Sequence, residues 1–174
     1  MRESLKLINR GTLGTQRKLL GVEVGVRAGV NALTMLQSMQ IGQLYLVDHY
    51  QPHTEHSGNV ITKEQQDQFF NSLIAKIQPF LDKTTVILLD SVEASKKFQD
   101  NYFDFVYLDG GHSYEQVQND MKAWFPKVKK SGILCGHDYN NKCTPDVTRA
   151  VKDYAKANNL ALTVMDDLDW MIIV

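Results

Sequence analysis

The chain has 174 residues, of which 43% are hydrophobic and 22% charged, and its formal net charge is -1, so we expect one soluble domain over residues 1–174. The near-neutral charge gives no basic surface for nucleic acid, and no apolar run approaches the ~20 residues of a membrane span. Because the N-terminus lacks the apolar core of a signal peptide and Cys135 and Cys143 are the only cysteines, we expect a reducing, cytoplasmic location without disulfides.

Apolar strands alternate with helix-like segments along the chain. After residues 5–13, which form a short helix or an irregular lead-in, we expect five buried strands at residues 20–25, 43–48, 85–90, 103–108 and 133–138. The helices between them are expected at residues 28–40, 62–81, 92–98 and 113–132. The last of these is interrupted near Pro126, so the basic residues 127–130 lie at a helix end, where cations suit the dipole.

Capping residues mark several helix starts. Thr62 and Ser113 each begin a capping-box pattern, and Thr144 followed by proline predicts a further helix to about residue 158. The chain then closes with two strands at residues 161–165 and 170–174. No crossover helix fits between these two strands, so they must be antiparallel neighbours.

These elements predict an α/β fold. Parallel neighbouring strands need a crossover connection, and the helices between the first five strands supply it. The C-terminal hairpin adds an antiparallel strand to this sheet. We therefore expect a doubly wound, mostly parallel sheet of seven strands.

Acidic residues lie at or near the ends of the five predicted parallel strands: Glu23, Asp48, Asp90, Asp109 and Asp138. The carboxyl ends of such strands form the ligand-binding edge of an open α/β sheet. A carboxylate inside an apolar strand, such as Glu23, must find a partner or face a ligand. For Asp90, which precedes Ser91 and a helix, a simple capping role is an equal alternative.

The first strand-to-helix turn contains Gly25 and Gly29. In this position backbone amides and a helix N-terminus meet nucleotide-like ligands, although turn and packing roles are the alternative for both glycines. Asp48 lies about 20 residues beyond the turn, the distance at which an acid accepts hydrogen bonds from ribose hydroxyls. The pattern therefore predicts a ligand that contains a ribose.

The fourth strand ends in Asp109, two glycines and His112. Ser113 already serves as the N-cap of the next helix, which leaves Asp109 and His112 without that structural role. A histidine has a reference pKa near 6.5 and suits proton transfer. We therefore expect His112 and Asp109 at a catalytic site.

Residues 21–29 (GVEVGVRAG) resemble the first motif of the class I methyltransferases that use S-adenosylmethionine. The resemblance covers nearly the whole chain and implies a Rossmann-like sheet with a C-terminal antiparallel hairpin strand. It implies that Glu23, Gly25, Gly29 and Asp109 contact the cofactor. It also implies that Asp48 holds the ribose and that Asp90 with Ser91 flanks adenine.

Residues 108–115 (LDGGHSYE), with Trp124, Pro126, Gly132 and residues 136–139 (GHDY), are similar to a subgroup containing macrolide-sugar O-methyltransferases and cephalosporin-hydroxylase-like proteins. This similarity implies that His112 is the general base and that Asp109, His137 and Asp138 hold Mg²⁺. His137 stands where an acid is usual, and Mg²⁺ prefers oxygen ligands. Mn²⁺ in place of Mg²⁺, or an ion held by Asp109, Asp138 and water, is an equal alternative. A purely structural role at the end of the strand is an equal alternative for His137.

The expected function is methyl transfer to a small-molecule acceptor, at a hydroxyl oxygen of a sugar or natural product. The sequence does not determine the oligomeric state, and a homo-oligomer is one of the options. A nicotinamide-dependent oxidoreductase is one alternative, although Gly25 and Gly29 lack the G-x-G-x-x-G spacing. A non-catalytic cofactor-binding protein is another, because the chain is short for the subgroup and has no extra N-terminal segment. The histidine-rich loop at residues 49–59 is expected to be a polar lid facing the acceptor, with a zinc site as the alternative.

Overall fold

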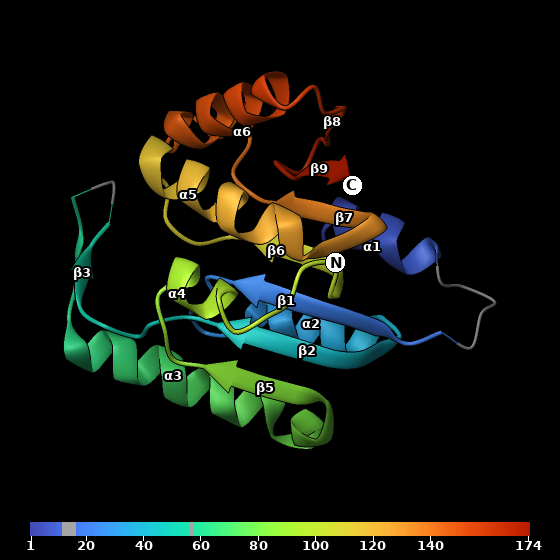
Figure 1. Cartoon of the computed structure of the whole chain (residues 1–174). Coiled ribbons are helices and arrows are strands. Elements are labelled where there is room, and N and C mark those ends of the chain that lie inside the picture. Colours follow the sequence, from blue (N-terminus) through green and yellow to red (C-terminus); the bar gives the residue numbers. More distant parts are fainter. Residues whose placement is uncertain (12–16, 56–57) are drawn as a thin grey trace.

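The computed structural model describes residues 1–11, 17–55 and 58–174. It has three layers, with one sheet between two layers of helices (Figure 1). Seven strands form one sheet in the order β5-β2-β1-β6-β7-β9-β8. These strands are β1 (Leu19–Val24), β2 (Ile41–Val47), β5 (Thr84–Ile87), β6 (Phe103–Leu108), β7 (Val128–Gly136), β8 (Leu162–Val164) and β9 (Trp170–Ile173). A separate hairpin of β3 (His53–Thr54) and β4 (Val60–Ile61) projects beside the sheet (Figure 1).

The strand directions confirm the predicted doubly wound topology. β1 pairs in parallel with β2 and β6, and β5 and β7 continue the parallel sheet on either side. β9 pairs antiparallel with both β7 and β8. The short connection between β8 and β9 therefore forms the antiparallel hairpin that the sequence predicted.

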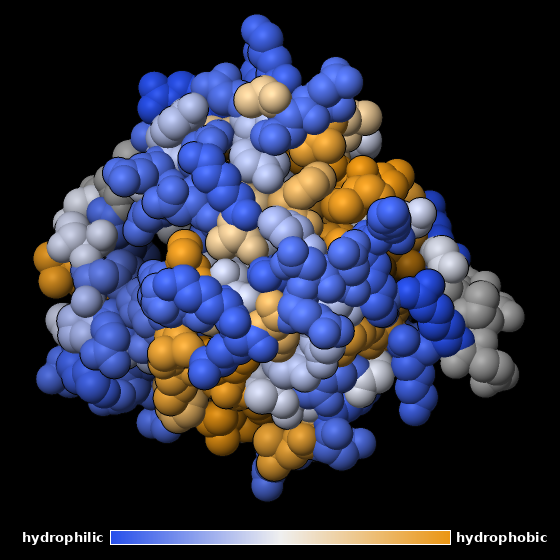
Figure 2. Space-filling model, in the orientation of Figure 1, coloured by the Kyte–Doolittle hydropathy of each residue, from blue (hydrophilic) through white to orange (hydrophobic). Residues whose placement is uncertain are grey.

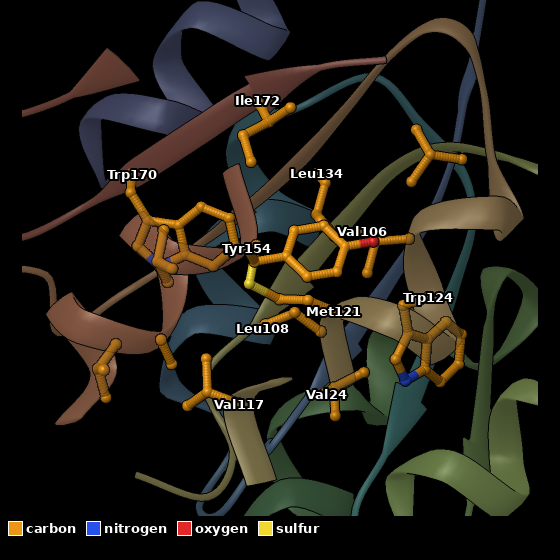
Figure 3. Close-up of a cluster of buried hydrophobic side chains, with 14 of the residues drawn as sticks. Val24, Val106, Leu108, Val117, Met121, Trp124, Leu134, Tyr154, Trp170 and Ile172 are labelled. Atoms are coloured by element: carbon orange, nitrogen blue, oxygen red, sulfur yellow. The ribbon is translucent and has the colours of Figure 1, made fainter. Parts of the chain in front are cut away.

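Helices cover both faces of this sheet (Figure 1). α1 (Glu3–Arg10), α2 (Val30–Ser38) and α3 (Lys63–Ile77) pack on one face, while α4 (Ser91–Ser95), α5 (Tyr114–Trp124) and α6 (Pro145–Ala157) pack on the other. Side chains of β6 alternate between the two layers, with Phe105 and Tyr107 facing α1–α3 and Val106 and Leu108 facing α4–α6. Figure 3 shows the hydrophobic cluster between the sheet and helices α4–α6, around Met121 and Trp124. Because both faces are covered, every residue of β6 is buried, and all except Asp104 are apolar or aromatic.

Local capping signals are confirmed where side chains complete them. Thr62 and Ser113 each accept the backbone N–H three residues ahead and take part in a reciprocal capping box. Thr144 precedes α6 as expected but makes no side-chain capping bond. The lead-in helix is α1, which ends at Arg10, and residues 12 and 13 of that prediction lie outside the described residues.

The expected helix over residues 113–132 is wrong at its C-terminal end. α5 ends at Trp124, a 3₁₀ turn follows over Phe125–Lys127, and β7 begins at Val128. The Ser131–Gly132 signal belongs to an irregularity in β7, where Ser131 has φ +63° and the register with β6 shifts. Lys129 therefore pairs with Asp104 across the sheet instead of following a helix.

Smaller boundary differences place several predicted site residues in loops, among them Asp90 and Asp138. β5 ends at Ile87 and β7 at Gly136, so Asp90 and Asp138 lie beyond their strands. The helix expected to reach residue 81 is α3 followed by a 3₁₀ turn over Gln78–Lys83. None of the helices in the described part of the chain is long and apolar enough to span a membrane.

Candidate functional site

A cavity of about 750 Å³ lies at the carboxyl ends of β1, β2 and β6. All five predicted strand-end acids line it: Glu23, Asp48, Asp90, Asp109 and Asp138. The predicted residues Gly25, Ser91 and His112 line it as well. In Figure 2 the surface is hollowed between the β3–β4 hairpin and the body of the protein, where hydrophilic residues dominate. The volume is in the range of small-molecule and cofactor sites.

The glycine turn after β1 is held by Asp48. Gly25 has φ +84°, and a Cβ there would lie 2.2 Å from the carbonyl oxygen of Asp109, so only glycine fits. Asp48 Oδ2 accepts the backbone N–H groups of Val26 (3.0 Å) and Arg27 (2.9 Å). Asp48 therefore supports the turn in addition to facing the cavity.

Gly29 has a different role from Gly25. It does not line the cavity, has φ +73° and precedes α2, and a Cβ there would lie 2.5 Å from Leu73 Cδ1. The structure therefore places Gly29 where α2 packs closely against α3. Direct contact between Gly29 and a cofactor stays a prediction.

Glu23 is the buried acid of the site, with 1% of its surface exposed. Its Oε1 accepts a hydrogen bond from Asn31 Nδ2 (3.1 Å), while Oε2 has no hydrogen-bond partner within the described part of the chain. Burial raises the pKa of Glu23 to about 8. A buried acceptor that lines a cavity and lacks a partner is suited to a polar group of a ligand.

Asp90 and Ser91 bound the cavity on the α4 side. Asp90 Oδ1 accepts the N–H of Val92 (2.9 Å), so it is the N-cap of α4, the capping role considered from the sequence. Ser91 Oγ accepts a hydrogen bond from Trp124 Nε1 (2.9 Å). Asp120 of α5 also lines the cavity, and burial raises its pKa to about 7.

The predicted base His112 and the predicted metal ligand His137 both contact Asp138. His112 Nε2 lies 3.0 Å from Asp138 Oδ2, and His137 Nδ1 lies 3.3 Å from Asp138 Oδ1. Asn141 Nδ2 also donates to Asp138 Oδ1 (2.6 Å). Burial opposes the charge of Asp138, but these hydrogen bonds hold its pKa well below the usual range. The hydrogen bond to Asp138 in turn raises the pKa of His112.

Asp109, His137 and Asp138 form a group that fits a divalent metal ion. One ligand atom from each lies within 4.8 Å of the others, and no further group of this kind occurs within residues 1–11, 17–55 and 58–174. His137 does not line the large cavity but lines a small pocket beside it with the two aspartates. Two carboxylates and one imidazole suit Mn²⁺ better than Mg²⁺, which prefers oxygen ligands alone.

The histidine-rich loop forms the β3–β4 hairpin. His49 and His53 stack edge to face with ring centroids 5.3 Å apart, and His53 Nδ1 lies 3.1 Å from Gln66 Nε2. Both histidines line the cavity, as expected for a polar lid. The described loop residues belong to no metal-ligand group, and the third histidine, His56, lies outside the described residues.

Sequence reasoning missed several residues of the site, among them Arg2 and Asn31 as well as Asp120 and Asn141. Arg2 reaches Asp109, with Nη2 3.1 Å from Oδ2, although 107 positions separate them. Asn31 donates to Glu23 from the first turn of α2. Asn31 could have been found from its place just after the glycine turn, but nothing in the lead-in segment pointed to Arg2.

Comparisons with known proteins agree with this geometry. The sequence model of a family described as a methyltransferase domain matches residues 22–139. An uncharacterized protein of Sinorhizobium fredii, y4gI, is 25% identical over 121 residues, which are 67% of this chain and 13% of that protein. The chain therefore spans about an eighth of the length of this curated relative.

Solved structures share the fold at low sequence identity. The O-methyltransferase NovP has a TM-score of 0.70 and 16% identity, over 98% of this chain and 78% of NovP. The calicheamicin methyltransferase CalS11 has a TM-score of 0.70 and 14% identity, over 98% and 77% of the two chains. An rRNA methylase from Streptococcus thermophilus has a TM-score of 0.65 and 10% identity, over 97% and 91%. At these identities the likeness concerns the fold alone.

Proposed function

The chain belongs to the methyltransferase-domain family, and on that premise we propose that its cavity brings a hydroxyl group of a small-molecule acceptor beside S-adenosylmethionine, with His112 as the general base. The family and the fold make the chain a class I methyltransferase, for which S-adenosylmethionine is the methyl donor. The observation that supports the rest most directly is the His112–Asp138 pair, which shares one cavity with Glu23 and the glycine turn.

The donor end of the cavity has groups that fit the methyl donor. Glu23 Oε2 is a buried acceptor without a partner in the described part of the chain, and Gly25 keeps the first turn clear of side-chain atoms. We propose that these residues hold the amino-acid part of the donor, that Asp48 accepts hydrogen bonds from its ribose hydroxyls, and that Asp90 and Ser91 lie beside its adenine. When bound, S-adenosylmethionine supplies a methyl group on a sulfonium centre.

We propose that His112 removes the proton of the acceptor hydroxyl. With Nε2 donating to Asp138, Nδ1 is the nitrogen that can accept a proton. Asp138 fixes this tautomer and stabilises the imidazolium that forms after proton transfer, as the carboxylate of a catalytic triad does. The remaining contribution of the protein is orientation, because methyl transfer is an in-line displacement.

Asp109, His137 and Asp138 are the residues that would hold a divalent ion. Such an ion, when bound, would stabilise negative charge on the acceptor oxygen. Asp138 would then have two roles. It contacts the imidazole of His112 through one oxygen, and it also belongs to the metal-ligand group.

The acceptor side supports a hydroxyl-rich small molecule. Polar side chains of the hairpin and of α3 line it, among them His53, Thr54, Glu55 and Gln66. Glu55 and His112 line the same cavity, and the charge of Glu55 contributes to the raised pKa of His112. Sugars present many hydroxyl groups to such donors and acceptors, so we propose a sugar or a sugar-bearing natural product as the acceptor class.

The experiment compares wild-type protein with His112→Ala. Calorimetric titration with S-adenosylhomocysteine measures donor-site affinity, and methyl transfer to a panel of sugar and natural-product hydroxyls measures turnover. We expect turnover to fall about 10²–10⁴-fold, the usual contribution of general acid–base catalysis, with S-adenosylhomocysteine affinity nearly unchanged. A fully active His112→Ala protein would exclude His112 as the base. Tight S-adenosylhomocysteine binding without turnover on any acceptor would favour a non-catalytic binding protein instead.

A further inference from the structure

The N-terminal segment places a permanent positive charge on one of the carboxylates of the proposed metal group. Arg2 Nη2 lies 3.1 Å from Asp109 Oδ2, and the other oxygen of Asp109 lies 3.9 Å from His137 Nδ1. Both side chains are mostly shielded from water, with 28% of Arg2 and 18% of Asp109 exposed. The guanidinium of Arg2 therefore faces Asp109 in a site where charge interactions are only weakly screened.

Arg2 is held in this position by a second, fully buried carboxylate. Its Nη1 lies 3.7 Å from Asp169 Oδ1, and its guanidinium lies over the ring of Tyr107, 5.6 Å from the centroid. Asp169 also accepts hydrogen bonds from the backbone N–H of Ser4 (3.2 Å), the hydroxyl of Ser4 and the hydroxyl of Tyr107 (2.9 Å). Because Ser4 lies in the first turn of α1, the docking of this helix directs Arg2 into the site.

We propose that Arg2 is a tethered cation that competes with a divalent metal ion for Asp109. The proposal rests on the proposed metal role of Asp109, His137 and Asp138, and it does not depend on methyl transfer. An arginine is always charged in proteins, and Arg2 donates to Oδ2 of the same carboxylate that a metal ion would need. A divalent ion at this group must therefore either displace Arg2 or lie close to a like charge.

This competition makes Arg2 a positioning residue of the active site. When Arg2 is in place, its positive charge balances the negative charge of Asp109, and its hydrogen bond holds the carboxylate in position without a metal ion. Coupling between two sites is reciprocal. The factor by which Arg2 weakens binding of the divalent ion is therefore the factor by which the bound ion weakens the association of Arg2 with Asp109. The docking of α1 is thereby linked to the occupancy of the metal group.

The experiment measures Mn²⁺ binding, which is independent of methyl transfer. Binding of Mn²⁺ is followed by the electron paramagnetic resonance signal of the free ion for wild-type protein, Arg2→Gln and Arg2→Lys. We expect Arg2→Gln to bind Mn²⁺ about 5- to 150-fold more tightly than wild type, the usual range for coupled sites. Arg2→Lys keeps the positive charge and should stay close to wild type.

Three further proteins locate the effect. Arg149→Gln is the matched control, since Arg149 pairs with Asp146 at 3.1 Å and neither residue lines the cavity. Asp109→Asn added to Arg2→Gln should remove the gain in affinity. Ser4→Ala loosens the anchor of α1 but leaves Arg2 in the chain. It should tighten Mn²⁺ binding less than Arg2→Gln does. This variant provides a second readout if Arg2→Gln folds poorly.

Three results would overturn the proposal. The first is Mn²⁺ affinity that does not rise in either Arg2→Gln or Ser4→Ala, which includes the case in which none of the proteins binds Mn²⁺. The second is Arg2→Lys tightening Mn²⁺ binding as much as Arg2→Gln, because the positive charge would then not be the cause. The third is a gain that persists in the double variant with Asp109→Asn. Loss of methyl transfer alone would count against the proposed function only. The Mn²⁺ titration would still test the competition between Arg2 and the metal ion.

Discussion

Replacing Glu23 with glutamine should change how the stability of the protein depends on pH. The carboxyl group is 1% exposed, has one hydrogen bond from Asn31, and lies near the carboxylates of Asp109 and Asp48. Burial raises its pKa from 4.5 to about 8, so the folded protein without ligand holds a proton on Glu23 at neutral pH.

The sign and size of the effect follow from this shift. Between pH 4.5 and about 8 the folded state binds one proton more than the unfolded state at this position, so the free energy of unfolding falls as pH rises. Each pH unit corresponds to about 1.4 kcal/mol, which gives a loss of roughly 4–5 kcal/mol across the interval. Glutamine has nearly the same shape and does not titrate, so Glu23→Gln should not show this loss.

Urea unfolding at pH 5, 7 and 9 tests the prediction on wild type and Glu23→Gln, with Glu115→Gln on the exposed first turn of α5 as the control. The new amide group can add a constant cost, so the change of the stability difference with pH is the quantity to compare. We expect the difference to move by a few kcal/mol in favour of Glu23→Gln between pH 5 and pH 9. Parallel pH dependences for wild type and Glu23→Gln would refute the raised pKa of Glu23.

Two further variants test the two ends of the cavity. Asp48→Ala should weaken S-adenosylhomocysteine binding by roughly 1.5–3 kcal/mol in calorimetry, the scale of hydrogen bonds to a charged group, while the exposed Asp82→Ala should have no effect; unchanged affinity would remove Asp48 from the site. Asp138→Asn takes away the carboxylate that raises the pKa of His112, so the acidic limb of the kcat/KM profile should move to lower pH, and any stimulation by Mn²⁺ should disappear. An acidic limb that stays in place would show that Asp138 does not control the base.

The parts of the fold that depend on neighbouring residues could be predicted from the sequence. β6 has the predicted bounds because its apolar run and the acid after it are both local signals. The capping boxes of Thr62 and Ser113 were found for the same reason, since each is completed within three residues. The rule that parallel strands need crossovers then gave the sheet and the edge where the acids meet.

The remaining features depend on contacts that the sequence pattern does not contain. The Arg2–Asp109 pair joins residues 107 positions apart, and its geometry depends on how α1 docks against Asp169. The turn signal at Ser131 and Gly132 was assigned to a helix end because a shift of register between paired strands leaves no local pattern. The packing of Gly29 against Leu73 of α3 is likewise a contact that no local pattern contains, and its contact with a cofactor stays a prediction.

The close contact between Gly25 and Asp109 separates what can vary in this enzyme from what cannot. The Asp109 N–H bonds to the carbonyl of Val24 (2.8 Å), and no side chain fits between Gly25 and the Asp109 backbone, so the donor turn and the catalytic loop form one rigid piece. In the described part of the hairpin, β3 and β4 pair only with each other, and an ion pair between Arg27 and Glu55 (3.8 Å) links the hairpin to the glycine turn. Under the proposed function, exchanges in the hairpin should alter which acceptor binds, while the spacing between the glycine turn and the loop after β6 stays constant. If the proposed function holds, grafting a foreign hairpin onto this sheet should change the acceptor while leaving S-adenosylhomocysteine binding intact.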